Sequence, residues 1–262
     1  MIAFHIGPIA VHWYGIFYAV SFLLGFFYLK KIIQAWKWIK IENIEAFMDD
    51  LLFYVILWVL LGGRLGYVFF YNPEYFLHQP WKVIAVWEGG MAFAGAFLGV
   101  ALALFLLARK YKISFLSITD LVVSFLPFGL GLGRIWNYLN WELYGKVCPD
   151  WLLGSFLCNK FWTDSFHIAN QLLESFFEGW LPFLVFQYLV WKKDILKKPG
   201  LLTWIFVVYY SVVRFILEFI RWHPKDYILY FGLSISQYFM ILFFLVGVGI
   251  LIKIKKLAKQ YS

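Results

Sequence analysis

The chain has 262 residues, of which 63% are hydrophobic and only 15% are charged. A soluble domain of this length has too little interior to hide so much apolar surface, so the composition excludes an ordinary water-soluble protein and indicates that lipid covers the chain. The formal net charge is +8. We do not expect nucleic acid as a partner, because the basic residues are spread over alternate loops instead of forming one patch.

Seven apolar stretches of about 20 residues are each long enough to cross a bilayer as a helix. They cover residues 10–29, 46–70, 91–108, 116–138, 171–190, 201–221 and 233–252. Residues 1–5 lack a basic region and a cleavage site, so we expect no removable signal peptide. The sequence therefore predicts an all-α integral membrane protein, with residues 1–262 forming a single seven-span membrane domain. The connection 139–170 is predicted to be an aromatic-rich outer loop that rests on the membrane surface.

Lys and Arg are distributed unevenly between alternate loops, which predicts the orientation of the chain. One set of loops contains fifteen of them: Lys30, Lys31, Lys37, Lys40, Arg109, Lys110, Lys112, Lys192, Lys193, Lys197, Lys198, Lys253, Lys255, Lys256 and Lys259. The other set contains five: Lys82, Lys146, Lys160, Arg221 and Lys225. Since the richer set faces the cytoplasm, the N-terminus is expected outside and the C-terminus inside.

Three arginines, Arg64, Arg134 and Arg214, lie within or at the edges of the apolar stretches. At a rise of about 1.5 Å per residue, Arg214 lies roughly 20 Å along an outward-running span, and all three reach the outer half of the membrane. Arginine keeps its proton at this depth, so each needs an anionic or strongly accepting partner. Three arginines at one level favour a phosphate that arrives from the outer leaflet and accepts their paired N–H groups.

A structural alternative remains open, in which the arginines only pair with carboxylates and hold the helices together. In this alternative Glu142 or Glu174 neutralises Arg134, and Glu218 neutralises Arg214 from one helical turn away. The sequence alone does not choose between the two interpretations.

Glycines and aspartates have structural and functional interpretations. Gly129, Gly131 and Gly133 favour close helix packing, with close approach of a lipid headgroup as the alternative. Both interpretations stay open for Gly89, Gly90 and Gly95. The aspartates at positions 49, 50 and 120 are expected to be interface or helix N-terminal charges and not catalysts.

Histidines and cysteines give weaker signals. His78, His167 and His223 lie in outer loops and are expected to be solvated. No metal-ligand spacing or nucleophilic triad occurs, so no metal or other cofactor is expected. Cys148 and Cys158 share the outer loop, where an oxidising exterior permits a disulfide; the sequence leaves that bond open.

Several motifs, taken together and in chain order, resemble the prolipoprotein diacylglyceryl transferase family over nearly the whole chain. They are His12-Trp13-Tyr14-Gly15, Gly62-Gly63-Arg64-Leu65-Gly66-Tyr67, Trp87-Glu88-Gly89-Gly90-Met91, Gly133-Arg134 through Asn137, Asn140, Glu142 and Gly145, Gln171-Leu172-Leu173-Glu174, and Arg214 through Arg221. The resemblance implies a seven-span enzyme of the bacterial inner (cytoplasmic) membrane. The family moves a diacylglyceryl group from phosphatidylglycerol to the lipobox cysteine of a prolipoprotein, among the surrounding membrane lipids, and releases glycerol phosphate.

The resemblance also implies site residues. Arg134, Arg214 and Tyr14 are the expected catalytic residues. The expected phosphatidylglycerol-binding residues are Arg134, Asn137, Asn140, Glu142, Gly145, Arg64 and Glu218. The arginines would stabilise charge growing on the departing phosphate, and Glu142 is expected to orient an arginine.

One departure from the family pattern concerns the general base. The family normally places a histidine three residues after the Met of its Gly-Gly-Met, and here Ala94 occupies that place. The family's histidine before span five is also displaced by one position, as His167. A cationic pocket that favours the thiolate can compensate, with the phosphate or Tyr14 relaying the proton. A catalytically impaired lipid-binding relative and a small lipid or solute transporter stay open as alternatives, although no repeated half-structure supports the transporter.

Overall fold

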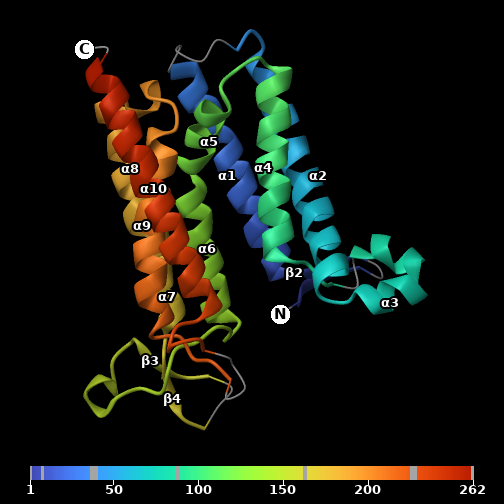
Figure 1. Cartoon of the computed structure of the whole chain (residues 1–262). Helices are drawn as coiled ribbons and strands as arrows, with labels where there is room; N and C mark the ends of the chain where they lie inside the picture. The colour runs from blue at the N-terminus through green and yellow to red at the C-terminus, as the bar shows by residue number, and fades with distance from the viewer. Residues whose placement is uncertain are drawn as a thin grey trace. The chain divides into compact units, whose positions relative to one another are not determined.

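The protein is represented by a computed structural model that describes residues 2–6, 9–35, 41–86, 89–161, 164–224 and 229–260. Side chains are described from residue 15 onward, apart from residues 18, 93 and 257–260. The chain is mostly helical and divides into two compact units, one formed by residues 1–25 and 120–262 and the other by residues 26–119 (Figure 1).

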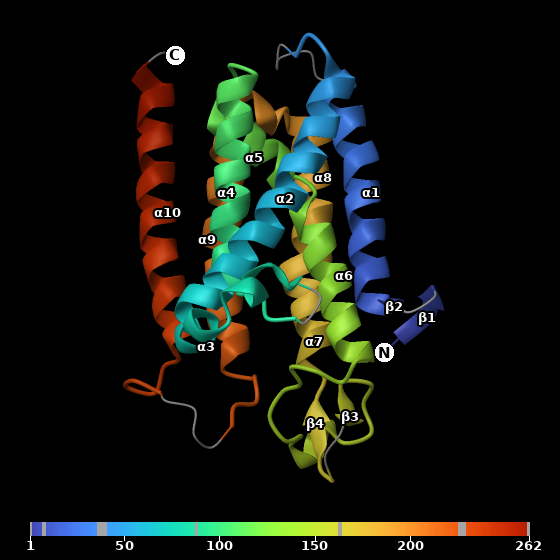
Figure 2. The ribbon, with the colours of Figure 1, turned by 90° about the vertical axis from the view of Figure 1, so that its right-hand side faces the viewer.

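Helices α2 (Ile44–Phe70) and α4 (Phe93–Lys110) form the core of the unit 26–119 and lie against each other (Figure 2). The side chain of Asn43 caps α2 by accepting a hydrogen bond from the Ala46 amide at 3.0 Å. Where the helices meet, a Cβ atom added to Gly95 would lie 2.1 Å from the carbonyl oxygen of Gly62. Gly95 is therefore a packing residue, which settles for this position the question that the sequence left open.

The same unit contains the C-terminal part of α1 (Trp13–Ala35) and two short helices between α2 and α4. These are α3 (Pro73–His78) and the 3-10 turn η1 (Pro80–Ile84). In the first unit, strands β1 (Ile2–Ile6) and β2 (Ile9–His12) pair antiparallel before α1 begins. Residues 10–12 of the first predicted span are therefore strand and not helix.

The fourth predicted span is a bent pair of helices, α5 (Phe115–Val123) and α6 (Leu126–Leu139), with an angle of 43° between them. Pro127 lies in the first turn of α6, where a backbone N–H would have no partner within the helix. Because proline cannot donate a backbone hydrogen bond, α5 cannot continue through this position as an unbroken helix. Within the unit 1–25 and 120–262, the buried Asp120 of α5 accepts hydrogen bonds from the backbone amides of Gly200 and Thr203, both at 2.7 Å. Asp120 thus caps a helix N-terminus, which confirms the structural interpretation of this aspartate.

The remaining helices of the unit 1–25 and 120–262 come in chain order after the connection 139–170. They are α7 (Asn170–Glu174), the π-helical turn η4 (Ser175–Trp180), α8 (Leu181–Lys193), the 3-10 turn η5 (Ile195–Lys197), α9 (Leu201–Glu218) and α10 (Ile235–Gln260). Gly131 of α6 and Gly179 of η4 meet closely, since a Cβ on Gly179 would lie 2.3 Å from the Gly131 Cα. The packing interpretation is therefore confirmed for Gly131, whereas added Cβ atoms on Gly129 and Gly133 would meet nothing within 4 Å.

The connection 139–170 contains secondary structure of its own in its described residues. It contains the 3-10 turn η3 (Asp150–Leu152) and the antiparallel strands β3 (Cys158–Lys160) and β4 (Phe166–Ile168). Cys148 and Cys158 form a disulfide bond. The expectation of a solvated His167 is wrong: its side chain is buried, and its Nδ1 lies 2.9 Å from the Gly145 carbonyl oxygen. The loop folds back on itself, and this tertiary contact is not readable from local sequence.

Within the described residues, four helices are long and apolar enough to cross a membrane: Gly15–Ala35, Ile44–Phe70, Leu201–Glu218 and Ile235–Lys256. The bent pair α5 and α6 becomes a fifth if it forms one span. Large apolar side chains such as Phe27, Phe53 and Leu245 are exposed on these helices, as expected for surfaces that contact lipid. The protein is therefore a mostly helical integral membrane protein.

Candidate active site

Two buried glutamates, Glu174 and Glu178, hold Arg134 and Arg214 together. The Arg134 Nη2 lies 3.0 Å from Glu178 Oε2, and its Nε lies 3.1 Å from Glu174 Oε2. The Arg214 Nη1 lies 2.5 Å from Glu174 Oε1 and 3.3 Å from Glu178 Oε1. Arg134 on α6 and Arg214 on α9 thus converge on one pair of carboxylates supplied by α7 and η4.

A third glutamate extends this network toward the end of α9. Glu218 lies one turn after Arg214, and its Oε2 is 2.6 Å from Arg214 Nη2. Ser234 donates a hydrogen bond from its hydroxyl to the other oxygen of Glu218 at 3.1 Å. We call Arg134, Glu174, Glu178, Arg214 and Glu218 the arginine–glutamate cluster.

The contacts in this cluster show which of the carboxylates predicted from the sequence pair with the arginines. Glu174 and Glu218 are arginine partners, whereas Glu142 is exposed and accepts a hydrogen bond from the Asn137 amide at 3.2 Å. Sequence reasoning missed Glu178, which is completely buried. Its signal was present, because a carboxylate four residues after Glu174 in an apolar stretch points to the same helix face and needs a cation.

The charges of the cluster nearly balance. Three carboxylates face two guanidinium groups, and Arg221 adds a third positive charge, its Nη1 lying 3.9 Å from Glu218 Oε2. Buried ions need such partners, since removing one leaves the other uncompensated in a medium of low dielectric constant. The arginines are consequently held in fixed positions before any ligand arrives.

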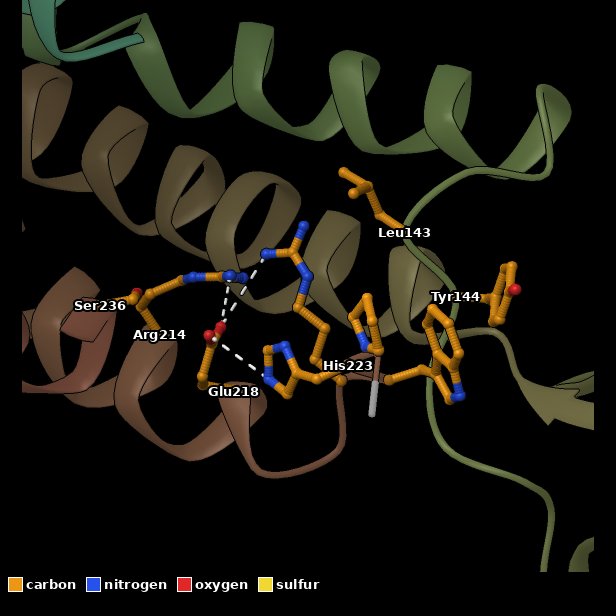
Figure 3. Close-up of a pocket in the computed structure, with 9 residues that line it drawn as sticks. Leu143, Tyr144, Arg214, Glu218, His223 and Ser236 are labelled. Atoms are coloured by element: carbon orange, nitrogen blue, oxygen red, sulfur yellow. Dashed lines mark hydrogen bonds and ion pairs between the residues drawn. The ribbon is translucent and has the colours of Figure 1, made fainter. Parts of the chain in front are cut away.

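A cavity of about 430 Å³ adjoins the cluster. It is lined by Leu143, Tyr144, Arg214, Glu218, Arg221, Trp222, His223, Pro224 and Ser236. Figure 3 shows that Glu218 lies between Arg214 and His223, with the His223 Nε2 3.7 Å from Glu218 Oε1. Of the two arginines in the cluster, Arg214 lines the cavity and Arg134 is not among the lining residues in the described part of the chain.

His223 is a second cavity residue that the sequence interpretation did not select. Partial burial lowers the pKa of its imidazole below the ordinary value of 6.5. The Glu218 carboxylate opposes this effect, and Arg221, Lys146 and Arg214 reinforce it. The ring is therefore mainly neutral at neutral pH, and a neutral imidazole can accept a proton.

The turn after α6 supplies other predicted site residues. Asn140 is the C-cap of α6, and its backbone amide donates to the Trp136 carbonyl at 2.9 Å. Gly145 is enclosed, because an added Cβ would lie 2.9 Å from the Ile168 carbonyl oxygen and 3.0 Å from that of Ile220. Only glycine lets the chain pass here, beside the residues that line the cavity.

Arg64 belongs to the other compact unit, and its guanidinium contacts backbone carbonyls. Its Nε donates to Val83 at 2.9 Å, its Nη2 to Lys82 at 2.6 Å, and its Nη1 to Gly90 at 3.2 Å as well as to Gly89. Gly89 and Gly90 both have positive φ angles, 83° and 79°, which glycine readily adopts. In this conformation their carbonyl groups accept hydrogen bonds from Arg64. Arg64 thus fastens the connection between α2 and α4.

The side chain of Tyr14, a predicted catalytic residue, lies outside the described residues. Glu88, from the motif that begins at Trp87, lies outside them as well. Ala94, at the place of the family histidine, is an exposed residue in the first turn of α4. Position 94 therefore supplies no basic side chain to the site.

Comparison with known proteins places these features in a family. A family model described as "Prolipoprotein diacylglyceryl transferase" matches residues 1–253. The chain is 41% identical over 220 residues to the protein of Rickettsia typhi named phosphatidylglycerol–prolipoprotein diacylglyceryl transferase, covering 84% of this chain and 83% of the relative. It is 36% identical over 258 residues to the Rickettsia bellii protein of the same name, covering 96% and 94%. The chain belongs to the prolipoprotein diacylglyceryl transferase family.

Proposed function

We propose that this protein transfers the diacylglyceryl group of phosphatidylglycerol to the lipobox cysteine of prolipoproteins. The thiolate sulfur forms a bond with the glyceryl carbon that carries the phosphate ester, the carbon–oxygen bond breaks, and glycerol phosphate leaves with the electron pair. The product is a thioether. The observation that most supports this activity within the family is the cationic cavity beside the arginine–glutamate cluster.

The chemistry needs positive charge where the phosphate departs. Arg214 faces the cavity and Arg221 lines it, so both can donate N–H groups to phosphate oxygens. Arg134 supports this arrangement by sharing Glu174 and Glu178 with Arg214. A well-placed donor of this kind stabilises the transition state by about 3–4 kcal/mol. We assign Arg134 and Arg214 to phosphate stabilisation, with Glu218 orienting Arg214.

The other predicted site residues receive roles within the same proposal. Asn137 and Glu142, joined by their hydrogen bond, and Asn140 form a polar rim for the headgroup at the end of α6. Gly145 leaves room for the chain beside the cavity. Tyr14 remains a proposed catalytic residue that contacts the lipid or relays a proton. For Arg64, the four backbone carbonyls favour a role in shaping the connection before α4.

We further propose that the chain crosses the bacterial inner membrane seven times, as a single membrane domain with residues 139–170 outside. The helices α4 and α7–η4–α8 would supply the two crossings beyond the five that length and composition indicate. Fifteen basic residues in one set of loops against five in the other support an outer N-terminus and a cytoplasmic C-terminus. In this arrangement the cluster lies toward the outer leaflet.

The activity is tested by reconstitution of the full chain in vesicles. The purified protein is mixed with phosphatidylglycerol and a peptide that carries a lipobox cysteine, and mass spectrometry measures the thioether product. We expect product with phosphatidylglycerol and none with phosphatidylcholine vesicles. An Arg214→Ala variant that turns over like the wild type would contradict the role assigned to that residue.

A further inference from the structure

The proposed reaction requires a group that accepts the thiol proton of the prolipoprotein cysteine. The family histidine is replaced by Ala94, so the usual acceptor for the thiol proton is missing. A replacement must lie near the arginines, be accessible from the cavity, and be neutral at the pH of the reaction. Among the described residues that line the cavity, the only imidazole is His223.

The position of His223 fits these requirements. Its side chain lines the same cavity as Arg214 and Arg221, and it retains 20% of its exposure, so a substrate can reach it. The carboxylate of Glu218, 3.7 Å away, is held by Arg214 and Ser234 and can in turn orient the ring. Base, orienting carboxylate and phosphate-binding arginine thus occupy consecutive positions along one wall (Figure 3).

We propose that His223 is the general base of this enzyme and accepts the thiol proton of the prolipoprotein cysteine. The inference rests on the proposed transferase function. The S–H bond breaks with its proton going to an imidazole nitrogen, and the sulfur lone pair forms the bond to the glyceryl carbon. The carbon–oxygen electrons leave with glycerol phosphate, and the imidazolium then returns its proton to water.

The charges around the imidazole are consistent with this assignment. Glu218 on α9 stabilises the imidazolium that forms, whereas Arg214, Arg221 and Lys146 disfavour it. Tyr144 completes the titratable groups that line the cavity. With burial included, the pKa of His223 is lowered, so the ring is ready to accept a proton at neutral pH and returns it readily afterwards.

The pKa of the cysteine thiol sets an upper limit on the rate gain that a general base can give. A free cysteine with a pKa of about 8.5 is roughly 3% thiolate at pH 7, so complete proton removal gains at most about 30-fold. Without a base, the rate should rise steadily with pH until about 8.5. With His223 as base, kcat/KM should be nearly constant between about pH 6.5 and pH 8 and fall in acid as the imidazole is protonated.

The test compares wild type with His223→Gln in phosphatidylglycerol vesicles between pH 5.5 and pH 9.5. We expect kcat/KM of the variant to be about 10- to 30-fold lower at pH 7 and to approach the wild type above about pH 9, where the thiol ionises unaided. His78→Gln, which changes an exposed histidine outside the cavity, is the matched control and should leave the profile unchanged.

Three outcomes would overturn the inference. One is an unchanged His223→Gln profile, and another is a loss that persists equally at pH 9.5, which would indicate a structural role. The third is a wild-type profile that rises steadily through pH 8, and this measurement holds even if the variant fails to fold. Absence of thioether from wild type would instead contradict the transferase function itself, so the two failures are distinguishable.

Discussion

Individual charges in the arginine–glutamate cluster contribute both to folding stability and to activity, and a double-mutant cycle can separate the two contributions. Arg134→Gln leaves Glu178 buried without its main partner, and breaking such a pair costs about 3–5 kcal/mol of folding free energy. Adding Glu178→Gln to this variant removes the unpaired charge. Because the two sites are coupled, it should restore at least about 1 kcal/mol of the free energy of unfolding. Activity should remain at least about 100-fold low in both, because the positive charge of Arg134 that supports Arg214 is still missing.

The measurements are denaturant unfolding in detergent and thioether formation in vesicles. Glu45→Gln is the matched control, since its carboxylate pairs with Lys30 at 2.6 Å while 70% exposed. An exposed pair of this kind contributes about 0–1 kcal/mol, so the control should change little. Strictly additive stability losses for Arg134 and Glu178 would show that the pair is not coupled.

Restoring the family histidine provides a separate test at the residue scale. If His223 already supplies the base, Ala94→His should raise wild-type kcat/KM at pH 7 by far less than the about 30-fold that removal of the thiol proton can contribute. A large rise, measured in the same vesicle assay, would mean that the natural chain lacks a working base. That result would favour a catalytically impaired member of the family over an active one.

At the scale of elements, the contact between α2 and α4 depends on missing side chains. Gly95→Ala would place a Cβ 2.1 Å from the Gly62 carbonyl oxygen, and the helices must separate to accommodate it. Such overpacking destabilises a fold by about 1–3 kcal/mol. Gly249→Ala in α10 is the control, because an added Cβ meets nothing within 4 Å and alanine favours helix. Equal unfolding midpoints for the two variants would contradict the close approach.

The elements also show which features a sequence reveals. Apolar length predicted the long helices at 15–35, 44–70, 201–218 and 235–256, because a span needs about 20 apolar residues whatever it packs against. Strand β2 at residues 10–12 and the π-helical turn η4 were not predicted, since they depend on neighbouring segments. The bend before α6 was not predicted either, although Pro127 signals it in the sequence. Arg134 and Arg214 were predicted as one site because charge in an apolar stretch needs a partner.

Residues brought in by tertiary contacts were harder to predict. Glu178 carried a signal in its spacing from Glu174, but His223 and Ser234 follow α9 in segments with no periodicity. Only the cavity and the contacts of Glu218 connect them with Arg214. The buried state of His167 likewise depends on Gly145, 22 residues away, through a contact that local sequence does not encode.

For the whole molecule, the decisive question is how many times the chain crosses the bilayer. Seven crossings place Trp151 outside and Lys112 in the cytoplasm. Five crossings, without α4 and α7–η4–α8, reverse both positions and leave Lys198 cytoplasmic in either case. All three residues are exposed, so each can accept a cysteine without disturbing a core.

In a Cys148→Ser/Cys158→Ser background, we expect a membrane-impermeant maleimide to label Trp151→Cys in intact bacterial cells. Lys112→Cys and the control Lys198→Cys should be labelled only after the cells are opened. The physical reason is the distribution of basic residues, which holds the Lys112 and Lys198 loops on the cytoplasmic side. Labelling of Lys112→Cys but not Trp151→Cys in intact cells would instead establish five crossings. The connection 139–170, with its cavity residues Leu143 and Tyr144, would then face the cytoplasm, which would contradict the proposed outer position of the site.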